Sequence, residues 1–261
     1  MSSFDQLLSS LKNPQIVWSF IKRKFKSIGI RKHSEYQKFI ILARSRTGSN
    51  LLISYLNNHP SIIAETEIFR DLQGERPEQM LPKLFRPYPS RIKAVGFKIF
   101  YYHPLHTDGT ALWNELISMK NLHVIHLKRK NILRTLISRK IADQKDKWAS
   151  FDAEDSAQES IKSVRFEVSE LKEGFEQTRQ WEEEGDRRFQ NHPLLTLYYE
   201  DLADVPEDTF KKITAFLGLT YQAPKTYFQK QNPEKTSDLL ANYAELKQSF
   251  MGTPWSGFFE E

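Results

Sequence analysis

A polar turn follows a short apolar run near the start of the chain. The run covers Phe39 to Ala43, and the turn reads Arg-Ser-Arg-Thr-Gly-Ser-Asn from Arg44 to Asn50. Apolar residues at helical spacing begin with Leu51. A helix that starts directly after a strand and a tight turn leaves its first N–H groups without partners, beside the positive end of its dipole. The sequence therefore predicts an anion-binding site at this turn.

The turn supplies a permanent charge of its own. Arg46 presents a planar fork of donors that matches two oxygens of a phosphate or sulfate group. Gly48 allows the backbone to approach a ligand closely. We expect the rest of the contacts from the neighbouring residues, which are Thr47, Ser49, Asn50 and Leu51.

The turn departs from the P-loop of nucleotide-binding proteins at two positions. Ala43 replaces the first glycine of that pattern, and Ser49 replaces its lysine. The lysine serves β- and γ-phosphates with magnesium, so its loss disfavours a kinase or a nucleoside triphosphatase. A transferred sulfuryl group carries less charge than a transferred phosphoryl group, so a sulfuryl-transferring site can function without this lysine. A P-loop kinase-like phosphotransferase with a degenerate loop remains the alternative, and a phosphate-binding or membrane-associated scaffold is a third hypothesis.

Segments that read as strands alternate with segments that read as helices after the turn. Strands are predicted at Arg91–Phe100, His123–Leu127 and Leu194–Tyr199. Helices are predicted at Ile132–Ile141, within Glu154–Gln190, and at Pro206–Leu217. This alternation predicts an α/β fold, with a P-loop-like parallel sheet covered by helices on both faces. There is no internal repeat or low-complexity linker, so a single domain over residues 36–261 is expected.

The composition excludes several kinds of site. None of the 261 residues is cysteine, which rules out disulfides, thiolate metal ligands and a cysteine nucleophile. No cluster of His, Asp and Glu has the spacing of a metal site. No apolar run approaches the roughly 20 residues that span a bilayer, so a cytoplasmic protein is expected.

The positive charge is concentrated at the N-terminus. Residues 1–38 carry a net charge of +6, whereas the other 223 residues carry −1. A near-neutral body argues against nucleic acid as a partner. Residues 1–35 read as a basic amphipathic helical segment, which either docks on the domain or makes a peripheral contact with an anionic membrane.

Four segments in order resemble the sulfotransferases that use 3′-phosphoadenosine-5′-phosphosulfate (PAPS). Residues 46–52 look like the 5′-phosphosulfate loop of that family. Residues 124–148 are similar to its 3′-phosphate motif, with Arg129 at the strand end and Ser138 two helical turns later. Residues 194–219 resemble a later strand-and-helix element. Residues 237–255 look like the C-terminal segment of the bacterial carbohydrate branch, which includes trehalose and Nod-factor sulfotransferases.

Two features differ from the mammalian cytosolic enzymes of this family. Those enzymes carry a lysine where this chain has Arg46, and an arginine in the loop is the form of the bacterial carbohydrate and Golgi-type branches. Their C-terminal Arg-Lys-Gly motif is absent here. Lys225 and Lys230 are the candidates for part of its role.

The resemblance implies a reaction and its participants. PAPS would be the co-substrate, 3′-phosphoadenosine-5′-phosphate (PAP) the product, and a hydroxyl of a carbohydrate or glycolipid the acceptor, with in-line transfer and no metal. Transfer to a hydroxyl needs a proton acceptor. Glu67 matches a Glu-aliphatic-Phe form of the family's catalytic carboxylate, and Glu65 and His103 are the alternatives. Lys98 and Trp148 are candidates for contacts with the substrate.

Overall fold

The computed structural model describes residues 31–151, 163–225 and 234–260, and it describes no side chains for residues 145–151. The predicted helical segment over residues 1–35 therefore lies almost wholly outside the described residues. Its docking, its peripheral contact with a membrane and the domain boundary at residue 36 stay predictions. Within the described part, no helix combines the length and the apolar character needed to cross a bilayer.

Seven strands and ten helical segments make up the described chain. The strands are β1 Lys32–His33, β2 Gln37–Ala43, β3 Ile62–Glu65, β4 Tyr88–Pro89, β5 Ala94–Phe100, β6 Leu122–Lys128 and β7 Leu194–Tyr198. The helices are α3 Ser49–Asn58, α4 Pro77–Leu84, α5 Thr110–Ser118, α6 Ile132–Phe151, α7 Val168–Arg188, α8 Tyr199–Asp204, α9 Pro206–Phe216, α10 Thr236–Leu239, α11 Tyr243–Ser249 and the 3-10 helix η1 Ser256–Phe259.

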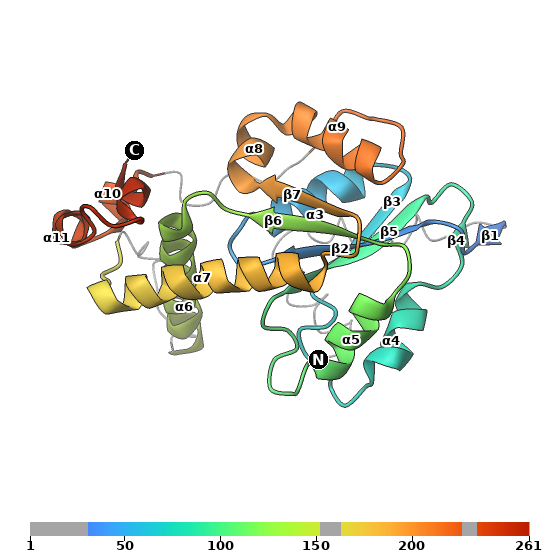
Figure 1. Cartoon of the computed structure of the whole chain (residues 1–261), viewed down its shortest axis with the longest axis horizontal. Helices are drawn as coiled ribbons and strands as arrows, with labels where there is room; N and C mark the ends of the chain where they lie inside the picture. Colours follow the sequence, from blue (N-terminus) through green and yellow to red (C-terminus); the bar gives the residue numbers. More distant parts are fainter. Residues whose placement is uncertain (1–30, 152–162, 226–233, 261) are drawn as a thin grey trace.

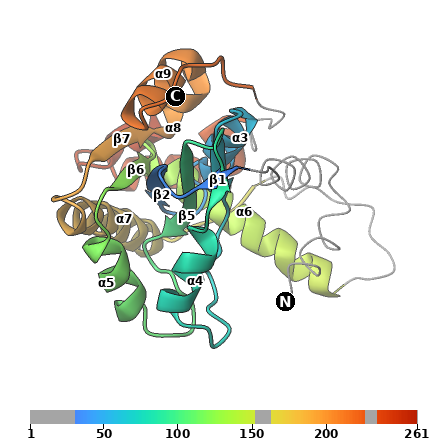
Figure 2. The ribbon, with the colours of Figure 1, turned by 90° about the vertical axis from the view of Figure 1, so that its right-hand side faces the viewer.

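Five of the strands form one parallel sheet in the order β3-β5-β2-β6-β7. Helices α3, α8 and α9 cover one face, and α4, α5 and α7 cover the other (Figures 1 and 2). This arrangement confirms the predicted α/β class with helices on both faces. Because β2 lies in the middle of the sheet, the turn that follows it opens at the centre of the carboxyl edge, where open α/β sheets bind ligands.

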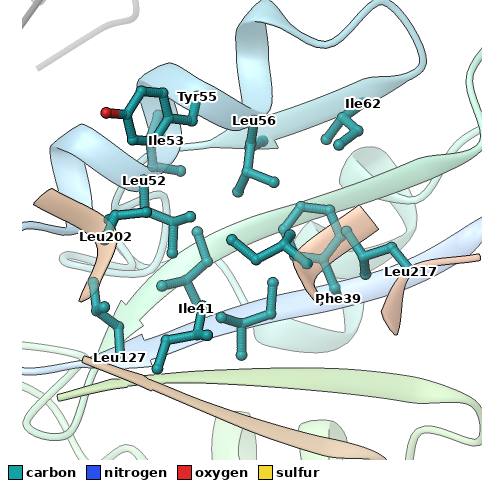
Figure 3. Close-up of a cluster of buried hydrophobic side chains, with 14 of the residues drawn as sticks. Phe39, Ile41, Leu52, Ile53, Tyr55, Leu56, Ile62, Leu127, Leu202 and Leu217 are labelled. Atoms are coloured by element: carbon teal, nitrogen blue, oxygen red, sulfur yellow. The ribbon is translucent and has the colours of Figure 1, made fainter. Parts of the chain in front are cut away.

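The pleat of the central strand supplies both halves of the core. Phe39, Ile41 and Ala43 of β2 face the cluster formed with α3 and α9, part of which is drawn in Figure 3. Ile40 and Leu42 face the cluster formed with α4 and α5. Alternate residues of a strand point to opposite faces, so a strand buried on both faces is apolar throughout. This accounts for the unbroken apolar run from Phe39 to Ala43.

Helix α7 is attached to the sheet edge by buried polar contacts. Asp186 of α7 accepts hydrogen bonds from Nζ of Lys128 and from the ring of His126, each at 2.7 Å. Burial lowers the pKa of His126 to about 4, so its ring is neutral at neutral pH. Nearer the start of α7, the side chain of Arg44 donates to the hydroxyl of Thr178. These contacts fix α7 beside the turn that follows β2.

Some observed elements differ from the predicted ones in their bounds, and one strand was not predicted. The predicted strand Leu194–Tyr199 ends at Tyr198, because Tyr199 begins α8. The region 154–190 holds one described helix, α7, and residues 152–162 lie outside the described part. Strand β3 was not predicted, since Ile62–Glu65 is too short for its alternation to be distinguished from a loop.

Candidate functional site

The turn between β2 and α3 has an unusual backbone. Arg46 and Gly48 both adopt positive φ angles, of 68° and 82°. Gly48 is the N-cap of α3, and its carbonyl accepts the N–H groups of Leu51 and Leu52. The hydroxyl of Thr47 donates to the carbonyl of Arg44 at 2.7 Å. Positive φ in a non-glycine residue costs free energy and is concentrated at ligand sites, so the turn has the geometry of an anion cradle.

Gly48 is required for a second reason, which is its close contact with a residue distant in the sequence. A Cβ at Gly48 would lie 2.2 Å from Cδ2 of Tyr199, the first residue of α8. The guanidinium of Arg129 lies 4.5 Å from the centroid of the same ring. Tyr199 thus sits between the turn and the end of β6.

Arg46 and Arg129 are joined to each other through the turn. Nε of Arg46 donates to Oγ of Ser138 at 3.0 Å, and Nη1 of Arg129 donates to the carbonyl of Arg46 at 3.1 Å. The three residues that the sequence assigned to the two ends of the donor therefore meet at one place. They come from the turn after β2, the end of β6 and the second turn of α6.

The side chain of Arg129 is only 11% exposed, and its hydrogen-bonding capacity is incompletely used. Its Nε has no hydrogen-bond partner among the described residues, and the nearest carboxylate oxygen, from Glu200, is 4.0 Å away. Glu200 is already engaged by the backbone N–H groups of Lys130 and Asn131. Burial lowers the pKa of Arg129, and Arg134 and Arg46 add to this, whereas Tyr199 and Glu200 oppose it. A buried cation in this state favours binding of an anion.

A second cluster faces the turn from β5 and from the segment after β3. Nζ of Lys98 lies 2.9 Å from Oε1 of Glu67 and also donates to the side chain of Asn50. Nε2 of His103 lies 3.8 Å from Oε2 of Glu67. The structure thus brings Glu67, Lys98 and His103 together, and Asn50 connects them to the turn after β2.

Burial controls the charge of two members of this cluster. It lowers the pKa of Lys98, which the adjacent Glu67 carboxylate partly offsets. It also lowers the pKa of His103 to about 4, with Glu67 again opposing and Arg70 and Lys98 reinforcing the shift. His103 is therefore neutral at neutral pH, and Glu67 is the acidic member of the cluster.

Both clusters line one cleft of about 570 Å³. Its charged lining comprises five basic side chains and three acidic ones, which are Arg46, Arg70, Lys98, Arg129, Arg139, Glu67, Asp143 and Asp204. Arg139 and Asp143 pair with each other at 2.8 Å. Pockets of this size hold small ligands, and the excess of basic side chains favours an anionic one.

Most of the predicted site residues whose side chains are described line this cleft, but Thr47 and Glu65 do not. Thr47 is buried, and its hydroxyl donates to the carbonyl of Arg44 within the turn. Glu65, at the end of β3, is not among the lining residues. Trp148 lies in α6 where side chains are not described. The segment 74–90, whose Pro, Arg and Gln residues suggest a pocket-lining loop, instead forms α4 and β4 away from the cleft.

Several residues that line the cleft were missed by sequence reasoning, among them Tyr199, Tyr102 and Arg70. Tyr199 directly follows the strand β7, and Arg70 lies three residues after Glu67, so position at a strand end was the available signal. Within the described residues, no group of three or more His, Asp or Glu side chains could hold a metal ion.

The contact between Gly48 and Tyr199 predicts a measurable coupling. Gly48→Ala combines a left-handed backbone, which costs a non-glycine residue about 1–2 kcal/mol, with a clash against Tyr199. In a Tyr199→Ala background the clash disappears, so the substitution should then cost only the backbone part. Urea unfolding of the four proteins of this double-mutant cycle measures the difference.

Gly218→Ala is the matched control for this cycle. Gly218 has a φ of 67°, and a Cβ added to it would meet no atom within 4 Å, so its replacement should cost about 1–2 kcal/mol in either background. An equal cost of Gly48→Ala with and without the Tyr199 ring would contradict the contact.

Sequence comparisons place the chain among known enzymes. Residues 103–223 match a family model described as the sulfotransferase family. Nodulation protein H of Rhizobium tropici is 28% identical over 242 residues, which cover 86% of this chain and 93% of that protein. Nodulation protein H of Rhizobium meliloti (strain 1021) is 25% identical over 239 residues, covering 86% of this chain and 95% of that protein.

Two solved structures are similar at a lower level. A sulfotransferase domain from the curacin biosynthetic pathway gives a TM-score of 0.42 at 16% identity, covering 70% of this chain and 74% of that one. Mouse sulfotransferase SULT7A1, complexed with PAP, gives 0.43 at 15% identity, covering 80% of this chain and 66% of that one. The match to the family model over residues 103–223 and the similarity to Nodulation protein H over most of the chain confirm the resemblance to sulfotransferases, and they indicate an enzyme that transfers a sulfuryl group.

Proposed function

We propose that this enzyme transfers the sulfuryl group of PAPS to a hydroxyl of a carbohydrate or glycolipid acceptor, in line and without a metal ion. The observation that carries the proposal is the pairing of two clusters in one cleft. The turn after β2 and Arg129 form a positively charged cluster suited to an anion. This cluster faces the carboxylate of Glu67, which Lys98 holds in place.

The donor fits the first cluster by its charges. PAPS carries anionic groups at both ends of its ribose, and the cluster has two arginines from different segments. Arg46 and the first N–H groups of α3 would hold the 5′-phosphosulfate. Arg129 and Ser138 would hold the 3′-phosphate, and the unsatisfied Nε of Arg129 supports an anion at this position. Gly48, Ser49, Asn50 and Leu51 line the cleft between them.

The second cluster supplies the acid–base chemistry. The proton of the acceptor hydroxyl passes to the carboxylate of Glu67 while the acceptor oxygen forms a bond to sulfur. The bond between sulfur and the phosphate oxygen breaks, and its electron pair leaves with PAP. Arg46 and Lys98 stabilise the charge that develops on the sulfuryl and leaving oxygens. Glu67 is favoured over Glu65 because it lines the cleft and Glu65 does not.

The acceptor class rests on two kinds of support. The C-terminal segment resembles that of the bacterial carbohydrate branch, and the chain is similar over most of its length to Nodulation protein H. The cleft wall beyond Glu67 carries Arg70, Tyr102 and Leu105, a mixture of polar and aromatic groups that suits a sugar ring.

Measuring turnover in the presence of a metal chelator distinguishes the proposed sulfotransferase activity from a kinase activity. The purified protein is incubated with sulfur-labelled PAPS, excess EDTA and an extract of glycans and lipids, and in parallel with labelled ATP and magnesium. We expect label from PAPS in a glycan or glycolipid, undiminished by EDTA. Transfer only from ATP with magnesium would establish the phosphotransferase instead.

Selectivity for the 3′-phosphate is the second expected result. Because Arg129 would form a charge-assisted contact with that group, worth roughly 1.5–3 kcal/mol, Arg129→Ala should weaken PAP binding about 10- to 150-fold. Adenosine 5′-phosphate lacks the group, so its weaker binding should change little. Calorimetry measures the affinity for both nucleotides. If the native protein bound them equally well, the assignment of Arg129 and Ser138 to the 3′-phosphate would be wrong.

Glu67 and Arg46 should differ in which step they affect. Glu67→Gln should leave PAP affinity nearly unchanged and lower kcat by about two to four orders of magnitude, as for a lost proton acceptor. Arg46→Ala should lower kcat and PAP affinity together, and Arg46→Lys should be milder because the charge survives. Glu65→Gln is the matched control and should retain turnover. Normal turnover of Glu67→Gln would assign the base to another group.

A further inference from the structure

His103 is fixed in place by its backbone and by its ring. Its N–H donates to the carbonyl of Phe100 at 3.0 Å, and its carbonyl accepts the indole N–H of Trp113 at 3.0 Å. Its ring packs against those of Phe100 and Tyr102, with centroids 4.9 and 5.5 Å away. Only 2% of the residue is exposed. The ring therefore has little freedom to turn.

One ring nitrogen of His103 has a structural task. The N–H of Phe100 donates to Nδ1 at 3.3 Å. The N–H of Tyr101 donates to Ala43 of β2, and successive N–H groups of a strand point to opposite sides, so the N–H of Phe100 points toward β3. Strand β3 has already ended at Glu65, opposite Phe97. A buried N–H needs an acceptor, and Nδ1 of His103 provides it.

The other nitrogen faces the carboxylate. An acceptor nitrogen carries no proton, so a neutral ring holds its single proton on Nε2. Nε2 lies 3.8 Å from Oε2 of Glu67, while Lys98 binds Oε1. Contacts of this length at catalytic groups often shorten when substrate binds. The charged groups that face the pair are Lys98, Arg70 and Arg46, all cationic, which disfavours a second proton on the ring.

We propose that His103 is a positioning residue that donates its Nε2 proton to Glu67, and that it is not the proton acceptor of the reaction. The proposal rests on the proposed function, in which Glu67 takes the proton of the acceptor hydroxyl. Lys98 and His103 would then hold one carboxylate oxygen each. The remaining lone pairs of Glu67 are left for the hydroxyl in the cleft.

Two substitutions separate the two nitrogens of the ring. The side-chain amide of asparagine ends near the place of Nδ1, so His103→Asn keeps an acceptor for Phe100 but no donor for Glu67. The amide of glutamine reaches the place of Nε2, so His103→Gln keeps the donor. A misplaced catalytic group costs up to about 100-fold, so we expect His103→Asn to lose about 10- to 100-fold in kcat with unchanged KM for PAPS. His103→Gln should keep most of the native kcat.

Each alternative gives a different pattern. If His103 were the base, both variants would lose kcat about equally, by about two to four orders of magnitude. If its role were only to cap Phe100, His103→Asn would keep turnover and His103→Gln would lose stability. Either pattern overturns the proposal.

Nitrogen NMR tests the tautomer without any turnover. In protein labelled with ¹⁵N-histidine, the signals of His103 are those missing from His103→Asn. We expect a protonated Nε2 and an unprotonated Nδ1 that persist from pH 8 down to about pH 5, because the ring titrates near 4. A proton on Nδ1, or a charged ring at pH 6, would contradict the proposal. Full turnover of Glu67→Gln with the expected tautomer would instead count against the proposed function alone.

Discussion

The site depends on the link between Arg46 and Arg129. The backbone carbonyl of Arg46 accepts a hydrogen bond from Arg129, and the side chain of Arg46 donates one to Ser138. Three segments that are distant in sequence are therefore held around one point. The two arginines are thereby held near each other, and burial lowers the pKa of Arg129, to which the charge of Arg46 adds. Bringing cations together in a partly buried place is unfavourable unless an anion joins them. The fold thus holds two arginines at one place in a way that favours the binding of an anion.

The parallel sheet explains how the turn after β2 and Arg129 come to face Glu67. The carboxyl ends of β2 and β6 supply the turn and Arg129, while β5, on the other side of β2, supplies Lys98. Lys98 contacts both Asn50 of the turn and Glu67. One buried amine therefore fixes the distance between the group that would hold the donor and the group that would receive the proton.

Local patterns could be predicted from the sequence, and contacts between distant segments could not. The turn at residues 44–50 and Arg129 follow apolar strands directly, so their place at the carboxyl edge was evident. Whether Glu65 or Glu67 enters the cleft depends on where β3 ends, and a four-residue strand gives no such signal. Tyr199 was missed because its role is a contact with Gly48, and the task of Nδ1 in His103 arises only because β3 is shorter than β5.

A crystal structure of the protein with PAP tests the central claim most directly. The account predicts the 5′-phosphate against the N–H groups at the start of α3, with Arg46 beside it, and the 3′-phosphate against Arg129 and Ser138. It also predicts Glu67 across the cleft, free of contact with the nucleotide. A second hollow at the opposite edge of the sheet is lined by Lys38, Lys93 and Lys120. PAP bound there, or bound in the cleft with no phosphate on Arg129, would contradict the account.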